Sequence, residues 1–139
     1  MCVVMSEDNI RIARHGYELL AAGDLDGVLE LIDPEVELEI HTGRPDLPET
    51  ERLHGHAGFL ENLRLLQEVF DDVVVTPEEF IEAGEDLVVP IHTAGRGRAS
   101  GIRVENRVTH IWTIRDGKAT RFRVFATKEQ ALEAAGLGE

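Results

Sequence analysis

The chain has 139 residues, 42% of them hydrophobic and 29% charged, which is the size and composition of one globular domain. Its 27 acidic residues outnumber 14 Lys and Arg, and the net charge of −13 disfavours binding to nucleic acid or to an anionic membrane. No apolar run approaches the roughly 20 residues of a membrane span, and the start lacks the pattern of a secretory signal. We therefore expect a soluble, cytoplasmic protein with a single domain over residues 1–139 and disorder in residues 1–6.

The first third of the chain predicts two helices and a strand. Apolar residues at helical spacing indicate an amphipathic helix over 7–22 that ends at Gly23. Asp24 is typical of a helix N-cap and predicts a second, short helix to Leu31, which Asp33-Pro34 ends. Residues 35–41 alternate between acidic and apolar types, which predicts a half-buried strand.

The remainder predicts a loop, a helix, a run of strands and a last helix. Residues 44–52 hold two prolines and three acids without periodicity, and indicate a surface loop that either closes over a site or is inert. A third amphipathic helix is expected over 56–70. The pattern then predicts strands at 73–83, 87–97, 101–115 and 118–126, and a short helix at 128–135.

This order of elements predicts an α+β domain, with helices packed on one side of a strongly curved, mostly antiparallel sheet. Strand parity decides which side chains face the helices. In the strand 101–115, Asn106, His110 and Trp112 share the inward face. The side chains expected to point inward are Val36, Leu38, Phe59, Leu63, Val89, Ile91, Val104, Val108, Trp112, Phe122 and Val124.

His110 is the first candidate for a catalytic residue, because it is a lone ionisable side chain on an apolar strand face. Two interpretations remain open. The ring is either a neutral imidazole bonded to a backbone carbonyl or to Asn106, or a general acid, base or hydrogen-bond donor to a substrate carbonyl. Tyr17 faces inward from the first helix, and its hydroxyl either polarises a carbonyl or has a purely structural partner.

Other inward residues are candidates for substrate binding. His56 stands at the start of the third helix and is expected either at the rim of a cavity or capping backbone amides, and Asn106 at the mouth of a pocket. The candidate apolar wall, for which plain core packing is the alternative, consists of Phe59, Leu63, Val89, Ile91, Trp112 and Phe122.

Two further patterns have competing interpretations. His54 and His56, with Glu39 and His41, are residue types that bind zinc, but their predicted orientations diverge, so we expect no metal.

The outward sheet face carries arginines that either bind an anion or pair with acids across strands or across a dimer interface. We expect a homodimer through this face, with Ile111 and Phe125 supplying apolar contact. The arginines are Arg96, Arg98, Arg103, Arg107, Arg121 and Arg123.

Four short motifs follow one another in the order of a known family: residues 17–26 (YELLAAGDLD), 33–36 (DPEV), 55–58 (GHAG) and 112–118 (WTIRDGK). The sequence resembles the SnoaL-like polyketide cyclase and ketosteroid isomerase-like branch of the nuclear transport factor 2-like superfamily. The resemblance implies a cone-shaped fold around a deep apolar cavity, and commonly a homodimer through the outer sheet face.

The resemblance also relates single positions. His110 falls where the ketosteroid isomerases carry a protonated carboxylic acid in the oxyanion hole. Their general-base aspartate falls at or beside Ile40, and their oxyanion tyrosine at Gly16, one residue from Tyr17. This sequence therefore departs from the isomerase pattern at both of the latter positions.

These observations leave more than one function open, because the fold alone does not decide it. The first is binding of a small, carbonyl-containing hydrophobic molecule, with cofactor-independent proton transfer by His110 and Tyr17 as in an isomerase, cyclase or lyase. The second is a non-catalytic ligand-binding or accessory protein of the same fold. The third is an assembly module that uses the sheet face for partners.

Overall fold

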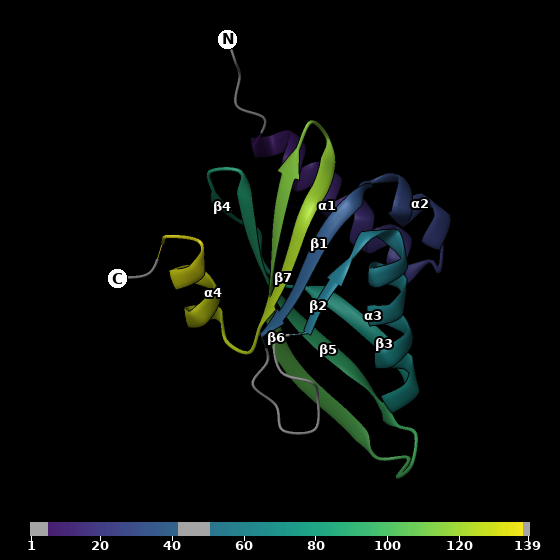
Figure 1. Ribbon diagram of the computed structural model, residues 1–139. Helices are drawn as coiled ribbons and strands as arrows, with labels where there is room; N and C mark the ends of the chain where they lie inside the picture. Colours follow the sequence, from purple (N-terminus) through teal and green to yellow (C-terminus); the bar gives the residue numbers. More distant parts are fainter. Residues whose placement is uncertain (1–5, 42–50, 138–139) are drawn as a thin grey trace.

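The computed structural model describes residues 6–41 and 51–137 (Figure 1). The described chain begins with two helices, followed by a long strand, a short strand and a third helix. These elements are α1 (Ser6–Ala21), α2 (Leu25–Glu30), β1 (Ile32–His41), β2 (Glu51–His54) and α3 (Gly55–Val69).

The second half of the chain is mainly β, and a short helix, α4, closes it. Its elements are β3 (Phe70–Pro77), β4 (Ile81–Ala83), β5 (Asp86–Gly97), β6 (Arg103–Arg115), β7 (Lys118–Phe125) and α4 (Lys128–Ala134).

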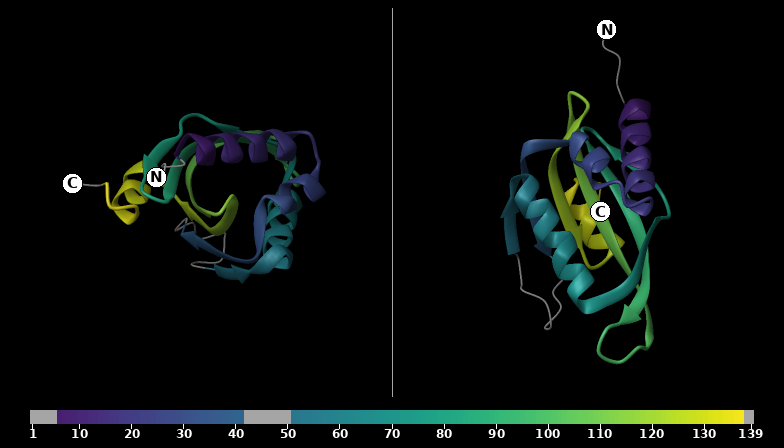
Figure 2. Two further views of the ribbon diagram at one scale, coloured as in Figure 1. Left: turned by 90° about the horizontal axis from the view of Figure 1, so that it is seen from above. Right: turned by 90° about the vertical axis from the view of Figure 1, so that its right-hand side faces the viewer.

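All the described strands join one sheet in the order β2-β1-β7-β6-β5-β3, with β4 paired to β5. Neighbours are antiparallel except β1 and β7, which run parallel with Leu38 opposite Phe122. The sheet curls strongly, so that α1 and α3 lie along its inner side while α4 packs outside (Figure 2). The expected α+β architecture, with N-terminal helices on a curved and mostly antiparallel sheet, is confirmed.

The inner face of the sheet carries the main core, and the predicted strand register is confirmed there. Two clusters of buried side chains form this core. Of the side chains expected to point inward, the first cluster contains Val36, Leu38, Phe59, Phe122 and Val124, and the second contains Val89 and Ile91. Leu63, Val108 and Trp112 pack against these clusters with part of their surface exposed. Val104, nearer the β5–β6 hairpin, is only half-buried.

Several element boundaries differ from the expected ones. Strand β1 begins at Ile32 and takes in Pro34, which lies where the register with β7 shifts, so the missing N–H of proline breaks no regular ladder there. The strand expected over 73–83 is two strands, β3 and β4, with residues 78–80 between them.

Two expectations about loops and ends are corrected in part. The loop expected over 44–52 is wrong for Glu51 and Arg52, which pair with β1 as part of β2, and its other residues lie outside the described residues. Ser6, expected to be disordered, is the first residue of α1, and residues 1–5 lie outside the described residues.

The turn that leads into α3 depends on two glycines of the GHAG motif. Gly55 has a φ of +75°, a region that side chains with a Cβ rarely adopt. A Cβ on Gly58 would lie 2.9 Å from the Cβ of Leu53, so α3 packs against β2 too closely for any side chain there. This part of the family resemblance therefore has a structural basis.

The outer face is partly covered by α4. Ala131 of α4 packs on Val88 and Ile111, and all three are fully buried. The expectation that Ile111 contributes apolar surface to a dimer is therefore wrong, because α4 of the same chain already covers it. Arg123 is also buried beneath this face, at 8% exposure, and donates a hydrogen bond to Asp86.

In the described part of the chain, no helix is both long and apolar enough to cross a membrane.

We predict that the inner core makes a large contribution to stability at Leu38, which is 1% exposed. Leu38→Ala should lower the free energy of unfolding by about 2–5 kcal/mol, because it removes buried methyl groups and leaves a cavity. Leu60→Ala is the matched control, since Leu60 is 36% exposed on α3, and it should cost less than about 1 kcal/mol. Urea denaturation measures both, and equal losses would contradict the assigned core.

Candidate functional site

The candidate site is built around His110, which strand alternation in β6 directs to the inner face of the sheet. Its Nδ1 atom lies 2.7 Å from the hydroxyl oxygen of Tyr17 in α1, so the two side chains share a hydrogen bond. The imidazole and the Phe122 ring also meet in a T-shaped contact, with centroids 4.7 Å apart. A helix and two strands therefore fix the position of one ionisable ring.

Trp112 extends this hydrogen-bonded pair. Its Nε1–H donates to the Tyr17 hydroxyl at 2.8 Å. The indole also packs on Phe122, with centroids 4.2 Å apart, and lies 6.5 Å from the Phe59 ring. The result is a chain of polar atoms, Trp112 to Tyr17 to His110, next to the aromatic rings of Phe59 in α3 and Phe122 in β7.

Burial decides the charge state of both titratable groups in this chain. It lowers the pKa of His110 to about 3, because the cationic ring would lose its hydration. Burial likewise raises the pKa of the Tyr17 phenol, and the hydrogen bond from Trp112 opposes this only in part. Both side chains are therefore neutral at pH 7.

His110 is not sealed inside the core. On the same inner face, Val89 and Ile91 of the neighbouring strand are completely buried, whereas His110, Trp112 and Val108 keep part of their surface exposed. Leu63 of α3, which packs over this region, is also only partly buried. His110 therefore keeps part of its surface exposed on an otherwise apolar wall.

Two of the predicted site residues lie elsewhere. The Nε2–H of His56 donates to the carbonyl oxygen of Ile32 at 2.7 Å, so this side chain ties α3 to the start of β1 and does not cap the amides of its own helix. Asn106 is exposed, opposite Thr93 in the β5–β6 pair, and forms no hydrogen bond with His110. The open alternative of an Asn106 partner for His110 is therefore corrected, because the actual partner is Tyr17.

The remaining predicted wall residues do come together. Phe59, Trp112 and Phe122 form mutual ring contacts, and Leu63 packs on the same cluster. Val89 and Ile91 belong to the neighbouring cluster that contains Tyr17.

One residue of the site was missed by the sequence analysis. Phe80, from the segment between β3 and β4, contacts the Tyr17 ring edge-on with centroids 6.4 Å apart, and Arg14 lies over its outer side. Because the sequence pattern placed Phe80 inside a continuous strand, its position against α1 was hidden. Pro77, which cannot donate to a ladder, is the signal that could have indicated the break.

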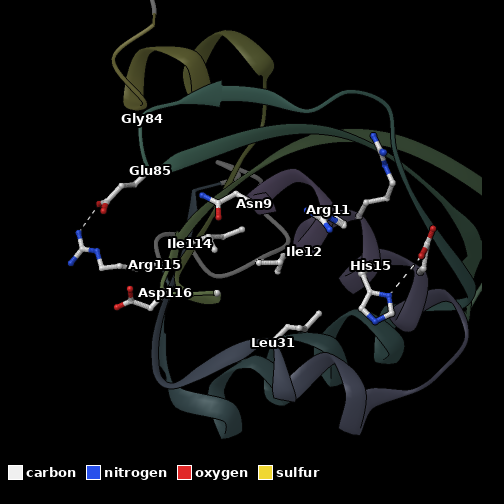
Figure 3. Close-up of a pocket in the computed structure, with 13 residues that line it drawn as sticks. Asn9, Arg11, Ile12, His15, Leu31, Gly84, Glu85, Ile114, Arg115 and Asp116 are labelled. Atoms are coloured by element: carbon white, nitrogen blue, oxygen red, sulfur yellow. Dashed lines mark hydrogen bonds and ion pairs between the residues drawn. The ribbon is translucent and has the colours of Figure 1, made fainter. Parts of the chain in front are cut away.

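Two hollows lie at the α1 end of the molecule. A small apolar cavity of about 50 Å³ touches Tyr17 and Trp112, which is room for little more than water-sized molecules. A groove of about 1280 Å³ opens between α1 and the two turns that precede β5 and follow β6 (Figure 3). Ile12, Leu31 and Ile114 line both, but neither His110 nor Tyr17 lines the groove among the described residues.

The histidines considered for a metal site have separate partners. His41 bonds to Glu39 at 3.0 Å, and His54 pairs with Glu35 at 3.2 Å. Within residues 6–41 and 51–137, no group of three or more metal-binding side chains is placed to hold an ion.

The family model described as the SnoaL-like domain matches residues 13–122, which include the second half of α1 and the Tyr17–His110 pair. The chain belongs to this family. Its sequence has no significant match among curated proteins.

Solved structures share the fold. A nuclear transport factor 2-like protein of unknown function from Burkholderia pseudomallei K96243 has a TM-score of 0.75 at 25% identity, over 90% of this chain and 95% of that chain. TerC, co-crystallised with polyporic acid, has a TM-score of 0.74 at 29% identity, over 92% and 98%. A protein from Sinorhizobium meliloti, provisionally described as a polyketide cyclase, has a TM-score of 0.65 at 21% identity, over 82% and 93%, which shows the fold alone. The nuclear transport factor 2-like fold expected from the sequence is confirmed.

The lowered pKa of His110 predicts a specific pH dependence of stability. The unfolded chain binds a proton at this residue near pH 6.5, whereas the folded protein resists it down to about pH 3. The contribution of the neutral ring to stability is therefore complete above pH 6.5 and is lost as the pH falls, by up to about 1.4 kcal/mol per pH unit. Urea denaturation from pH 7.5 to 4.5 measures this slope.

The control is His110→Gln, which has no titratable ring and should lack this part of the slope while keeping the contribution of all other groups. Parallel stability curves for the two proteins would show that the imidazole is not desolvated.

Proposed function

We propose that the protein binds a small hydrophobic molecule and positions a carbonyl-type oxygen of that molecule at His110. The observation that carries this proposal is the 2.7 Å hydrogen bond between Tyr17 and a neutral His110 on an apolar wall. Such an arrangement orients one imidazole without giving it a charge. It is therefore suited to a neutral or weakly polar ligand.

The surroundings of His110 support this ligand class. Phe122, Trp112 and Phe59 offer aromatic surface, and the partly exposed Leu63 and Val108 add aliphatic surface. Apolar binding sites gain affinity from apolar contact area and use few polar groups for orientation. TerC, 29% identical to this chain, was co-crystallised with polyporic acid, which makes that compound the first probe to test here.

A more specific form of this proposal adds catalysis to binding: cofactor-independent proton transfer of an isomerase, cyclase or lyase type. His110 is then the group that touches the reacting carbonyl, and Tyr17 acts through its hydrogen bond to His110. The alternative is a binding or accessory protein without turnover. The apolar Ile40 favours this alternative, because it stands at or beside the position at which the resemblance places the general base of the isomerases.

Binding can be followed directly, because Trp112 is the only tryptophan of the chain and lies within the proposed site. We predict that polyporic acid quenches its fluorescence in a saturable manner. His110→Leu should weaken this binding about threefold to tenfold, since it removes one hydrogen bond from an otherwise apolar site.

His92→Gln is the matched control, because His92 pairs with Glu105, away from the Tyr17–Trp112 chain, and it should leave affinity unchanged. Equal affinity of the His110→Leu variant and the unchanged protein would contradict the proposed role of His110.

His110→Gln separates the two versions of the proposal. Glutamine keeps a donor and an acceptor but cannot shuttle a proton near neutral pH, so binding should persist. If the protein is an enzyme, the catalytic rate with its substrate should fall by a factor of about 10²–10⁴. If the substitution changes affinity only, the protein is a binder.

We also propose a homodimer through the part of the outer sheet face that α4 leaves uncovered. Charges on this face are already paired within the chain, as in Arg121 with Glu39 and Arg107 with Glu78, which reduces repulsion between two identical surfaces. We predict a mass of two chains in light scattering at micromolar concentration. A single-chain mass would refute the dimer and leave the ligand site unaffected.

A further inference from the structure

We propose that Trp112, Tyr17 and His110 form a hydrogen-bond chain with a fixed direction, which leaves His110 with one N–H, on Nε2, to offer to a ligand. The site therefore selects molecules that present an uncharged acceptor oxygen, such as a carbonyl oxygen. This ligand class rests on the function proposed above, whereas the direction of the chain is a property of the protein alone.

The direction follows from counting protons. The indole of tryptophan has an N–H and no acceptor, so Trp112 can only donate to the Tyr17 hydroxyl, from 2.8 Å. The hydroxyl has a single proton of its own, and His110 Nδ1, at 2.7 Å, is the acceptor that the described residues offer it. Tyr17 therefore donates to Nδ1.

The opposite direction leaves a buried proton without an acceptor. If Nδ1 carried the proton, both His110 and Trp112 would donate to the phenol oxygen, and the phenol O–H would have to point elsewhere. Tyr17 is only 7% exposed, and Phe80 and a cavity with apolar lining lie beside its ring. An unsatisfied buried O–H is strongly disfavoured, so this arrangement is not populated appreciably.

The consequence appears at the other ring nitrogen. A neutral imidazole has one proton, so a Nδ1 that accepts requires the proton to be on Nε2. Among the described residues, no group forms a hydrogen bond with Nε2, and His110 is only partly buried. The free polar atom of the chain is thus a donor, and a ligand must supply the acceptor.

Trp112 is a positioning residue in this chain. It does not touch the proposed acceptor, but its N–H occupies the phenol oxygen and withdraws electron density from it, which makes the Tyr17 O–H a better donor to His110. A residue with an acceptor at position 112 would give the phenol proton a second destination. The donor-only indole removes that choice.

The test of the direction is nitrogen NMR of the ligand-free protein labelled with ¹⁵N-histidine. The two imidazole nitrogens resonate far apart according to whether they carry a proton. We expect His110 to show a protonated Nε2 and an unprotonated Nδ1 at pH 7. A protonated Nδ1 in the unchanged protein would overturn the proposal.

Two variants distinguish the hydrogen bonds from simple packing. Tyr17→Phe removes the donor to Nδ1, so the His110 nitrogens should shift towards the averaged values of two exchanging tautomers. Trp112→Phe keeps the Tyr17 donor, so the Nε2-protonated form should persist. If Tyr17→Phe left the His110 shifts unchanged, the phenol would not be setting the tautomer.

The ligand class is tested with three bicyclic probes of similar shape. The carbonyl of 1-indanone accepts hydrogen bonds, the N–H of indole donates one, and indane neither donates nor accepts. Titrations followed at the His110 nitrogens should give 1-indanone about threefold or more tighter binding than indane or indole. Indole binding at least as tightly as 1-indanone would overturn the selectivity. If no probe bound, the proposed ligand site would fail, while the tautomer data would still decide the direction of the chain.

Discussion

An imidazole placed on an apolar sheet face must find a hydrogen-bond partner, and this requirement shapes the whole inner side of the molecule. Losing hydration at His110 is costly unless another group replaces water. The replacement comes from α1, whose Tyr17 hydroxyl reaches across to Nδ1. This hydrogen bond therefore links the first helix to β6, and Trp112 completes it from the same strand. The polar chain and the packing of α1 on the sheet depend on each other.

The second constraint is the parallel pairing of β1 with β7. It joins the N-terminal elements to the end of the meander, and places Leu38 beside Phe122. Helix α3, which packs on β1, then brings Phe59 against Phe122 and Trp112. The aromatic surroundings of His110 are thus a product of sheet closure. On the other side, α4 covers Val88 and Ile111, so inner and outer faces are protected by different helices.

Periodicity was informative wherever one face of an element is buried. The alternation in β6 correctly directed His110 and Trp112 inward, and helical spacing did the same for Tyr17 and Phe59. The same reasoning failed at the segment around Phe80, where one long apolar pattern covers two strands. It also could not anticipate that α4 would bury Ile111, since alternation assigns a face but not the element that covers it.

The sequence by itself determined the fold class and the set of side chains that face the interior, because these depend on local spacing and parity, and its motifs carried the family resemblance. Only the tertiary structure decided which of these side chains meet. Tyr17 and His110 are 93 positions apart, and no local pattern specifies that their polar atoms lie 2.7 Å from each other. It likewise decided that Asn106 is exposed and that His56 serves the backbone of β1. The physical reason is that hydrogen-bond partners in a core are chosen by the curvature and closure of the sheet, which are properties of all its strands together.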